Sequence, residues 1–309
     1  MQRLLWGGRT MGRLKPVGPR RGIIVFAGQG DTRLDTRLDR HPVFVRALAD
    51  VSELCGQKIP PPSALGENSS QVERQMALAA YHMSAFDCLK DLGYEPVAAA
   101  GISLGEFAAA MVSGALSRVQ GYKAVLARAR CMQEYAGQGT MMAVLGLRMD
   151  VLSVLLRDAA WKVIYVSATY GDRVHLLSGS HDDLGAIRAE VANRGGRTVP
   201  VPSGIPSHCI LMERVVPCLT SALQNLLWTN PEIPWISGID GFVTRDAAKI
   251  QFRLVRQTVE PVSWPHVHNT LSYLHANVID GGPGHSVSRM AKSSPGLFVV
   301  ASSDDIKPW

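Results

Sequence analysis

Apolar runs typical of strands and apolar periodicities typical of helices alternate along most of the chain. The stretch GIIVFAGQG, residues 22–30, is almost continuously apolar and ends in a glycine-rich turn, which predicts a buried strand. Residues 70–93 carry apolar side chains at helical spacing, with a capping box from Ser70 to Glu73 at the start and Gly93 as a stop. This alternation predicts an α/β protein.

Another strand and two more helices follow. Residues 97–101 (VAAAG) predict a short strand, and a turn around Ser103 leads into a helix that extends to about residue 116. Ser117 and Gln120 form a second capping box, which opens a helix ending near Gly137. Beyond residue 206 the alternation resumes and reaches the strand-like segments NVIDGGPG and LFVVAS.

The middle of the chain has a different rhythm. Over residues 139–203 the pattern predicts strand, helix, strand, strand, helix and strand, which is the order of a ferredoxin-like split unit. We therefore expect a small domain at 139–203, inserted in a large α/β domain formed by residues 22–138 and 204–309.

Composition supports a globular enzyme. The chain has 309 residues, of which 46% are hydrophobic and 19% charged, enough to bury a large core. Its apolar runs are far shorter than the roughly 20 residues of a membrane span. Five cysteines, an odd number without a CxxC pair, favour a reduced, cytoplasmic location.

The net charge of +6 is concentrated at one end. Residues 1–21 contain six arginines and lysines and no acidic residue, so the remaining body is close to neutral. No apolar segment typical of a secretory signal follows. We expect a basic flexible tail at 1–21, or an over-long gene start with Met11 as the true beginning. The charge does not indicate nucleic-acid binding.

Ser103 lies between two glycines in GISLG, residues 101–105. Such glycines permit a tight strand-to-helix turn from which a serine projects toward the N-terminal amides of the helix. An oxyanion formed on a substrate carbonyl there would meet preorganised donors. A serine that only caps a helix fits the same five residues, so the pattern alone leaves both interpretations open.

Three further motifs accompany this one. FAGQGD, GISLGEF, RARCMQ and IPSHCILM occur in an order and at a spacing that resemble the malonyl-CoA:acyl-carrier-protein transacylases, a family that includes polyketide-synthase acyltransferase domains. The resemblance covers about residues 22–302. It implies an α/β-hydrolase-like large domain with a parallel sheet and a ferredoxin-like small domain.

The resemblance assigns the reacting groups. Ser103 matches the nucleophile that takes the acyl group, and His208 matches the general base that removes its proton, a task suited to an imidazole. Gln29 matches the residue that forms the oxyanion hole together with the backbone N–H of Leu104. Gln257 matches a position whose backbone carbonyl orients the histidine.

The resemblance also assigns the substrate-binding groups. Arg128 matches the arginine whose guanidinium binds the free carboxylate of a malonyl group. Ile102 occupies the position before the nucleophile, at the floor of the cleft, where the family usually has histidine. Ser207 and Leu104 accompany malonyl selection. Arg130, two residues beyond Arg128, is expected at the surface.

The implied reaction needs no bound cofactor and no metal. The acyl donor is malonyl-CoA and the acceptor is the phosphopantetheine thiol of an acyl carrier protein, discrete or part of a polyketide synthase. His266 and His268 lie two residues apart, which is poor ligand spacing on a helix, so we interpret them as structural. We expect a monomer without a nucleic-acid or membrane partner, acting in polyketide or fatty-acid synthesis.

Several polar positions around the expected site depart from the family pattern. Besides Ile102, they are Asp31, Thr32, Thr169, Gly238 and Glu260, the last three standing where asparagine is usual. These changes leave the proposed reacting groups intact. They favour a divergent member that serves a particular pathway.

Two other functions remain open at this level. An acyl hydrolase could use Ser103 and His208 with water as acceptor, or a different base and acid drawn from His268, His285, Asp240 and Asp280. The second version leaves Gln29 and Arg128 unexplained, and the chain has no HGGG-type loop. A non-catalytic binding protein would tolerate loss of the nucleophile and base, and both are present.

Overall fold

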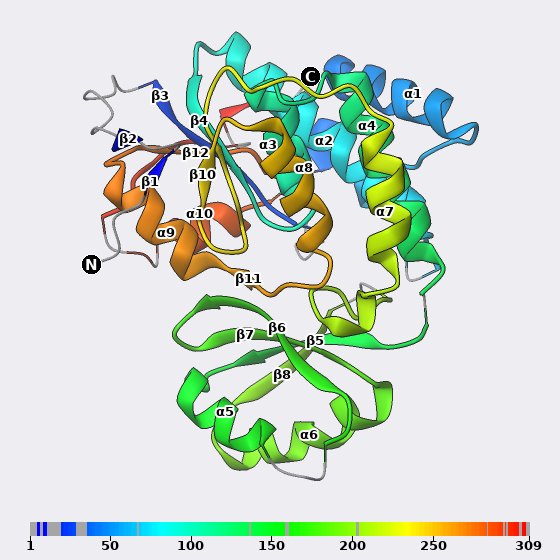
Figure 1. Ribbon diagram of the computed structural model, residues 1–309, viewed down its shortest axis with the longest axis vertical. Helices are drawn as coiled ribbons and strands as arrows, with labels where there is room; N and C mark the ends of the chain where they lie inside the picture. Colours follow the sequence, from blue (N-terminus) through cyan, green and yellow to red (C-terminus); the bar gives the residue numbers. More distant parts are fainter. Residues whose placement is uncertain are drawn as a thin grey trace.

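Two β-sheets organise the molecule (Figure 1). This computed structural model describes residues 5–6, 9–10, 20–28, 36–66, 68–135, 137–157, 161–201, 204–282, 284–292, 294, 296–302 and 305–306. Most of the predicted basic tail lies outside these residues. Within it, β1 (Leu5–Trp6) and β2 (Arg9–Thr10) pair as short antiparallel strands.

The larger sheet has the order β10-β9-β4-β3-β12-β13. Its strands are β3 (Arg21–Phe26), β4 (Glu95–Gly101), β9 (Trp235–Ile236), β10 (Val243–Thr244), β12 (Val278–Asp280) and β13 (Val299–Ala301). All neighbours are parallel except β10 and β9. Phe26 pairs with Gly101, so the loops that follow β3 and β4 leave the sheet side by side. Sites in open α/β sheets form at such carboxyl ends.

Both faces of the larger sheet are buried. Along β3, Ile24 and Phe26 belong to one core cluster, whereas Ile23 and Val25 belong to another, as the two-residue period of a strand requires. Residues of α1 (Pro42–Cys55), α2 (Gln71–Asp91), α3 (Gly105–Ser113), α4 (Arg118–Gln133), α7 (Val215–Gln224) and α8 (Ala247–Arg256) join the first cluster. Those of α9 (Trp264–Tyr273) and α10 (Ser286–Lys292) join the second.

Local signals in the sequence set the helix ends near the site. The capping box of Ser70 and Glu73 is present at the start of α2, and the Ser117 hydroxyl accepts from the Gln120 N–H at the start of α4. Helix α3 ends at Ser113, before the predicted residue 116, because Gly114 adopts a left-handed conformation with φ 88°. Short 3-10 helices occupy Thr36–Arg40, Pro62–Ala64 and Ile210–Met212.

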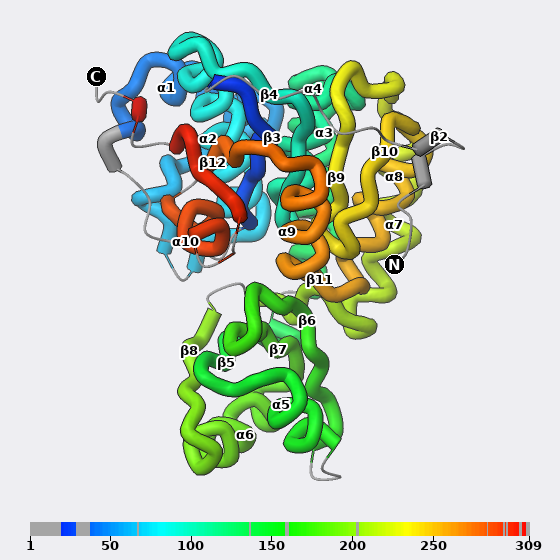
Figure 2. The backbone as a smooth tube through the Cα atoms, turned by 90° about the vertical axis from the view of Figure 1, so that its left-hand side faces the viewer, coloured from blue at the N-terminus to red at the C-terminus, as the bar shows by residue number. Residues whose placement is uncertain are grey.

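The smaller sheet has the order β11-β6-β7-β5-β8. The middle segment supplies β5 (Thr140–Leu145), α5 (Met149–Leu156), β6 (Ile164–Gly171), β7 (Val174–Gly179), α6 (His181–Asn193) and β8 (Arg197–Val201), in the predicted order. Helices α5 and α6 cover the face that points away from the larger sheet (Figures 1 and 2).

A fifth strand of this sheet comes from elsewhere in the chain. Strand β11 (Val262–Ser263) pairs in parallel with β6, with Val262 opposite Ala168. It follows α8 by a few residues and leads directly into α9 of the larger part. The chain passes between the large part and the small sheet before β5 and after β8, and the pairing of β11 with β6 adds a further connection. The sequence did not indicate this strand pairing.

Two of the five cysteines are paired, which a reduced compartment, favoured by the cysteine count, would not lead one to expect. Cys131 on α4 and Cys218 on α7 form a disulfide, with Cα atoms 6.0 Å apart. Cys55, Cys88 and Cys209 are free. The pairing arises because α4 packs against α7, a contact between segments far apart in the sequence.

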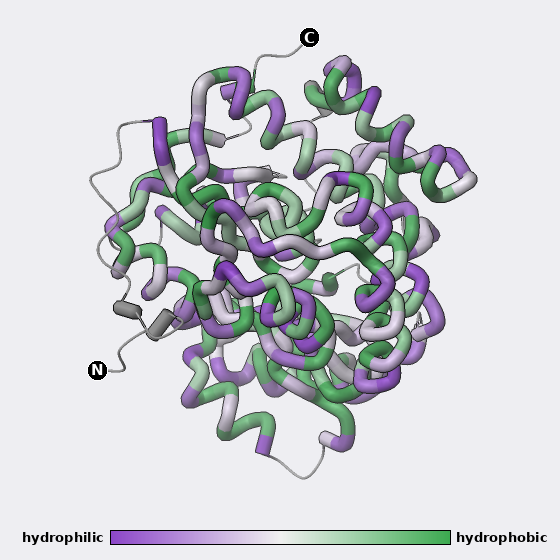
Figure 3. Tube along the Cα trace, turned by 45° about the horizontal axis from the view of Figure 1, so that its top comes forward, coloured by the Kyte–Doolittle hydropathy of each residue, from purple (hydrophilic) through white to green (hydrophobic). Residues whose placement is uncertain are grey.

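Apolar and hydrophilic residues alternate along the outer helices (Figure 3). Among the described residues, no helix combines the length and the apolar character that crossing a membrane requires.

Candidate functional site

The turn that carries Ser103 needs both flanking glycines. Strand β4 ends at Gly101, and α3 begins at Gly105. A Cβ at 101 would lie 2.2 Å from the backbone N of Glu106, and one at 105 would lie 2.2 Å from the carbonyl oxygen of Phe26. Any side chain at either position would therefore force the turn apart.

Ser103 itself has a left-handed backbone conformation, with φ 55°. Such a conformation costs a residue other than glycine about 1–3 kcal/mol and is concentrated at functional sites. The first amides of the helix that follows donate to carbonyls of this turn, Gly105 N–H to Ile102 O at 2.9 Å and Glu106 N–H to Ser103 O at 3.0 Å.

His208 contacts the Ser103 hydroxyl. Its Nε2 is 2.8 Å from Ser103 Oγ, and its Nδ1 is 2.5 Å from the carbonyl oxygen of Gln257. A carbonyl only accepts, so Nδ1 carries the proton and Nε2 is left to accept from the serine. His208 also has a positive φ, 63°, and its amide donates to Thr258 O at 2.9 Å. The segment holds the ring in one orientation.

The surroundings of His208 keep its imidazole neutral. Burial lowers the pKa of His208 to about 4, and the positive charge of Arg128 acts in the same direction. Near neutral pH the ring is therefore in the form that accepts a proton.

Arg128 places a buried cation next to the Ser103 hydroxyl. It is only 1% exposed, and its Nη2 donates to Ser103 Oγ at 3.3 Å. Its Nη1 donates to Gln75 Oε1 at 2.6 Å, and its guanidinium lies 5.8 Å from the ring centre of Phe107. Burial lowers the pKa of Arg128 to about 10, so it remains charged at neutral pH.

The guanidinium is incompletely neutralised. Its Nε has no hydrogen-bond partner among the described residues, and none of the ion pairs that they form includes Arg128. An unpaired buried charge is costly, so the site favours an anionic ligand.

Two glutamine side chains complete these contacts. The Gln257 side chain donates through Nε2 to Ser103 O at 2.9 Å, besides the carbonyl contact to His208 expected from the sequence. Gln75, which the sequence analysis missed, holds Arg128 from α2. Gln75 directly precedes the apolar run that begins at Met76, and only the structure shows that it is fully buried.

The other predicted residues surround this centre. Leu104 directly precedes α3 as its N-cap residue and is buried. Ile102 packs in the second core cluster and is 1% exposed, so its proposed contact with an acyl chain stays a prediction. Ser207 is buried, and its carbonyl accepts from Ser178 Oγ of β7 at 2.7 Å, which ties the histidine segment to the small sheet. Gln29 lies outside the described residues.

Asp240, Asp280 and His268, which belong to the alternative hydrolase triad, have contacts away from Ser103. Asp240 pairs with Arg253 at 2.8 Å. Asp280 accepts from the amide of Gly282 and from the amide and hydroxyl of Ser288. His268 Nε2 lies 3.2 Å from Ser272 Oγ on the same helix. His208 is the histidine that the described contacts bring to Ser103.

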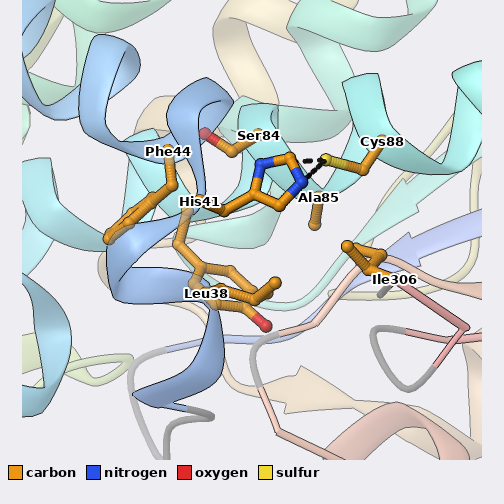
Figure 4. A pocket seen from close by; sticks show the side chains of 8 residues that line it. Leu38, His41, Phe44, Ser84, Ala85, Cys88 and Ile306 are labelled. Atoms are coloured by element: carbon orange, nitrogen blue, oxygen red, sulfur yellow. Dashed lines mark hydrogen bonds between the residues drawn. The ribbon is translucent and has the colours of Figure 1, made fainter. Parts of the chain in front are cut away.

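A contact between a cysteine and a histidine lies away from this site (Figure 4). Cys88 Sγ is 3.9 Å from His41 Nδ1, at a small cavity also lined by Phe44 and Ile306. Burial and the negative charges of Asp87 and Asp91 raise the pKa of Cys88 to about 11. The group stays a thiol at neutral pH and does not form a nucleophilic pair.

The fold and these contacts define an α/β protein in which a serine hydroxyl just beyond a parallel strand contacts a histidine and an arginine. A family model described as an acyl transferase domain matches residues 26–263, and the chain belongs to this family. The protein is an acyltransferase.

The relatives of the chain include stand-alone transacylases and long polyketide synthases. The malonyl CoA-acyl carrier protein transacylase of Salmonella typhimurium is 24% identical over 87% of this chain and 91% of its own length. The polyketide synthase GfsB of Streptomyces halstedii is 29% identical over 86% of this chain. The aligned part is only 5% of that much longer protein.

Solved structures of transacylases have the same fold as this chain. The malonyl-CoA:acyl carrier protein transacylase (FabD) of Xanthomonas oryzae pv. oryzae superposes with a TM-score of 0.82 at 29% identity, covering 92% of this chain and 94% of that one. A transacylase in complex with a type II polyketide-synthase acyl-carrier protein has a TM-score of 0.81 at 22% identity, covering 90% and 94%. The latter likeness concerns the fold alone.

Proposed function

We propose that the protein transfers a malonyl or related carboxyacyl group from coenzyme A to the phosphopantetheine thiol of an acyl carrier protein. The observation that carries the proposal is the convergence of a base and a buried cation on one serine hydroxyl, at 2.8 Å from His208 and 3.3 Å from Arg128. The names of the relatives, which include transacylases and polyketide synthases, support the same function.

In the first step the serine is acylated. Ser103 Oγ attacks the thioester carbonyl while His208 Nε2 takes its proton. The carbon–sulfur bond then breaks, and coenzyme A leaves as a thiol that receives this proton from His208. The N–H of Leu104, with Gln29, is the proposed donor set for the oxyanion.

In the second step the carrier thiol replaces the serine. The thiol attacks the ester and gives its proton to His208, and the ester bond breaks as Ser103 recovers its own proton. The Gln257 carbonyl holds Nδ1–H through both steps, so His208 returns to the same tautomer each time.

Arg128 selects the acyl group and also tunes the base. A carboxylate at the end of a malonyl group pairs with the two guanidinium nitrogens in place of the present contact with Ser103. This pairing frees the hydroxyl for attack. It also neutralises the charge that depresses the pKa of His208, so a carboxyacyl substrate makes the base stronger.

The finer description of the molecule belongs to the same proposal. We infer that residues 22–138 and 204–309 form an α/β-hydrolase-like catalytic domain and that residues 139–203 form a ferredoxin-like domain, with 1–21 as a basic N-terminal segment. We further propose a cytoplasmic monomer that needs no bound cofactor and no metal.

Mass spectrometry of the purified protein mixed with malonyl-CoA, methylmalonyl-CoA and acetyl-CoA tests the function. A malonyl mass on Ser103 that moves to a holo acyl carrier protein is the expected result, and Ser103→Ala should gain no acyl mass. His208→Ala should acylate about 10²- to 10⁴-fold more slowly. Rapid loss of the malonyl group to water, without transfer to the carrier, would instead establish the hydrolase.

A further inference from the structure

Glu106 is a fully buried carboxyl group next to the nucleophile that the two steps above do not use. It is the second residue of α3. Its Oε1 accepts from the amide of Gly238 at 2.5 Å, and its buried Oε2 has no hydrogen-bond partner among the described residues. Burying a carboxyl group with an unpartnered oxygen is costly. If packing were its only task, an apolar side chain of the same size would be more stable here.

The main chain of Glu106 connects the nucleophile turn to β9. Its N–H donates to Ser103 O at 3.0 Å, and its carbonyl accepts from the indole N–H of Trp235 at 3.1 Å. Its carboxyl group adds a third connection, to the segment that follows β9.

Gly238 carries this connection to the small sheet. Its carbonyl accepts from the amide of Ser263 at 2.9 Å, and Ser263 belongs to β11, which pairs with β6. A Cβ at 238 would lie 2.4 Å from Gly101 O and 2.8 Å from Glu106 Oε1. The Glu106 carboxyl group and the Gly101 carbonyl thus occupy the space that the Cβ of the asparagine expected at position 238 would need.

We propose that Glu106 is a positioning residue, whose carboxyl group holds the edge of the small sheet against the nucleophile turn through Gly238 and Ser263. The link sets the alignment of Ser103 with the histidine segment, which the small sheet also holds through Ser178. Of the proposed function, this inference uses only the assignment of Ser103 as nucleophile.

The carboxyl group of Glu106 is neutral at neutral pH. Burial raises the pKa of Glu106 to about 8, although the Gly238 amide and the charges of Arg253 on α8 and Arg128 on α4 oppose the shift, while Asp240 adds to it. His82 on α2, packed against Phe26 of β3, is neutral because burial lowers its pKa to about 3. Ionisation of Glu106 then places an unpaired charge in the core, and the turn must relax to hydrate it.

A fluorophosphonate probe tests this inference without a choice of acyl donor. The probe phosphonylates an activated serine and releases fluoride, so its rate reports the alignment of Ser103. Labelling is measured from about pH 6 to pH 10 in the unmodified protein, Glu106→Gln and Glu106→Leu, with thermal unfolding recorded for each. Glu190→Gln, on the exposed face of α6, is the matched control.

We expect labelling of the unmodified protein and of the control to fall above about pH 8, where Glu106 ionises. Glu106→Gln should lose this fall and keep most of the rate at neutral pH, because its amide oxygen still accepts from Gly238. Glu106→Leu should label about 10- to 100-fold more slowly at every pH, as expected for a misaligned reacting group.

Two results would overturn the inference: an alkaline fall that persists in Glu106→Gln, or a folded Glu106→Leu variant that labels at the unmodified rate. If the leucine variant does not fold, the pH profile of the glutamine variant decides alone. A protein that is labelled with this profile but never malonylated would refute the proposed function and leave the role of Glu106 intact.

Discussion

Single residues at the site act through charge as much as through contact. Arg128 depresses the pKa of His208 and also donates to the hydroxyl that His208 activates. In the proposed reaction the arginine of the free protein therefore restrains both the base and the nucleophile. We propose that a substrate carboxylate relieves both restraints and so links binding of the correct acyl group to the reactivity of the serine.

Removal of Arg128 should weaken or invert the preference for malonyl-CoA over acetyl-CoA. The lost charge-assisted pair is worth about 1.5–3 kcal/mol, or about 10- to 100-fold in relative acylation rate. The rates of Ser103 acylation by the two donors in Arg128→Ala measure this change. Arg130→Ala is the control, since Arg130 lies on the same helix but faces solvent. An unchanged ratio in Arg128→Ala would remove the arginine from substrate selection.

The pH dependence of acylation should differ between the two donors. His208 must be neutral to accept the serine proton, so the rate falls as pH drops through its pKa, which is about 4 in the free protein. Malonyl-CoA neutralises Arg128, so its acylation should begin to fall at a higher pH than that with acetyl-CoA. Single-turnover rates at saturating donor, measured from about pH 3 to pH 8, give both midpoints. Identical midpoints would show that Arg128 does not tune the base.

At the scale of elements, the nucleophile turn depends on how closely β3, β4 and α3 approach one another. Gly105 is the first residue of α3, and the carbonyl of Phe26 in β3 occupies the place of its missing side chain. The serine is held in a left-handed conformation because the strand and the helix on either side are fixed by this packing.

Gly105→Ala should therefore abolish most of the acylation, because its Cβ would press the backbone of α3 away from β3. Gly185→Ala is the matched control. Gly185 lies within α6 with nothing within 4 Å of the added methyl group, so that variant should gain about 0.5–1 kcal/mol of stability with unchanged acylation. Acylation rates and thermal unfolding of both variants test the pair, and a fully active Gly105→Ala would contradict the close approach.

At the scale of the whole molecule, the site lies where separate parts of the chain meet. Ser103 comes from the larger sheet, Arg128 from α4, and His208 from the segment that returns from the small sheet. The disulfide between Cys131 and Cys218 joins the helix of Arg128 to the helix that follows His208. It closes a loop with a sequence separation of 87 residues.

Loss of this disulfide should lower the free energy of unfolding. For a loop of this length, the entropy of the unfolded chain predicts about 4–5 kcal/mol. Denaturant unfolding of Cys218→Ser under oxidising conditions measures the loss, with Cys55→Ser as the control because Cys55 is unpaired. Thiol titration of the unfolded protein should find three free cysteines in the unmodified chain. Equal stability of both variants would mean that the bridge does not constrain the protein.

Much of the fold follows from local pattern. The strand at β3, the helix from Ser70 to Gly93 and the order of elements from 139 to 203 were predicted because periodicity and capping act between residues close in the sequence. The motifs likewise identified Ser103, His208 and Arg128, and the structure brings these three side chains into contact. The oxyanion donors Gln29 and Leu104 stay predictions.

What the tertiary structure alone decided are the pairings between distant segments. The residues next to Gln75, Glu106 and the two disulfide cysteines in the sequence do not predict which groups these side chains contact. The two residues of β11 are too few to carry a strand period, and they become a strand only because β6 lies beside them. Helix caps and apolar periodicity depend on residues that are close together in the sequence, so they can be predicted from it. Whether a polar group is buried, and what it pairs with, depends on segments that are far apart in the sequence and meet only in the folded protein.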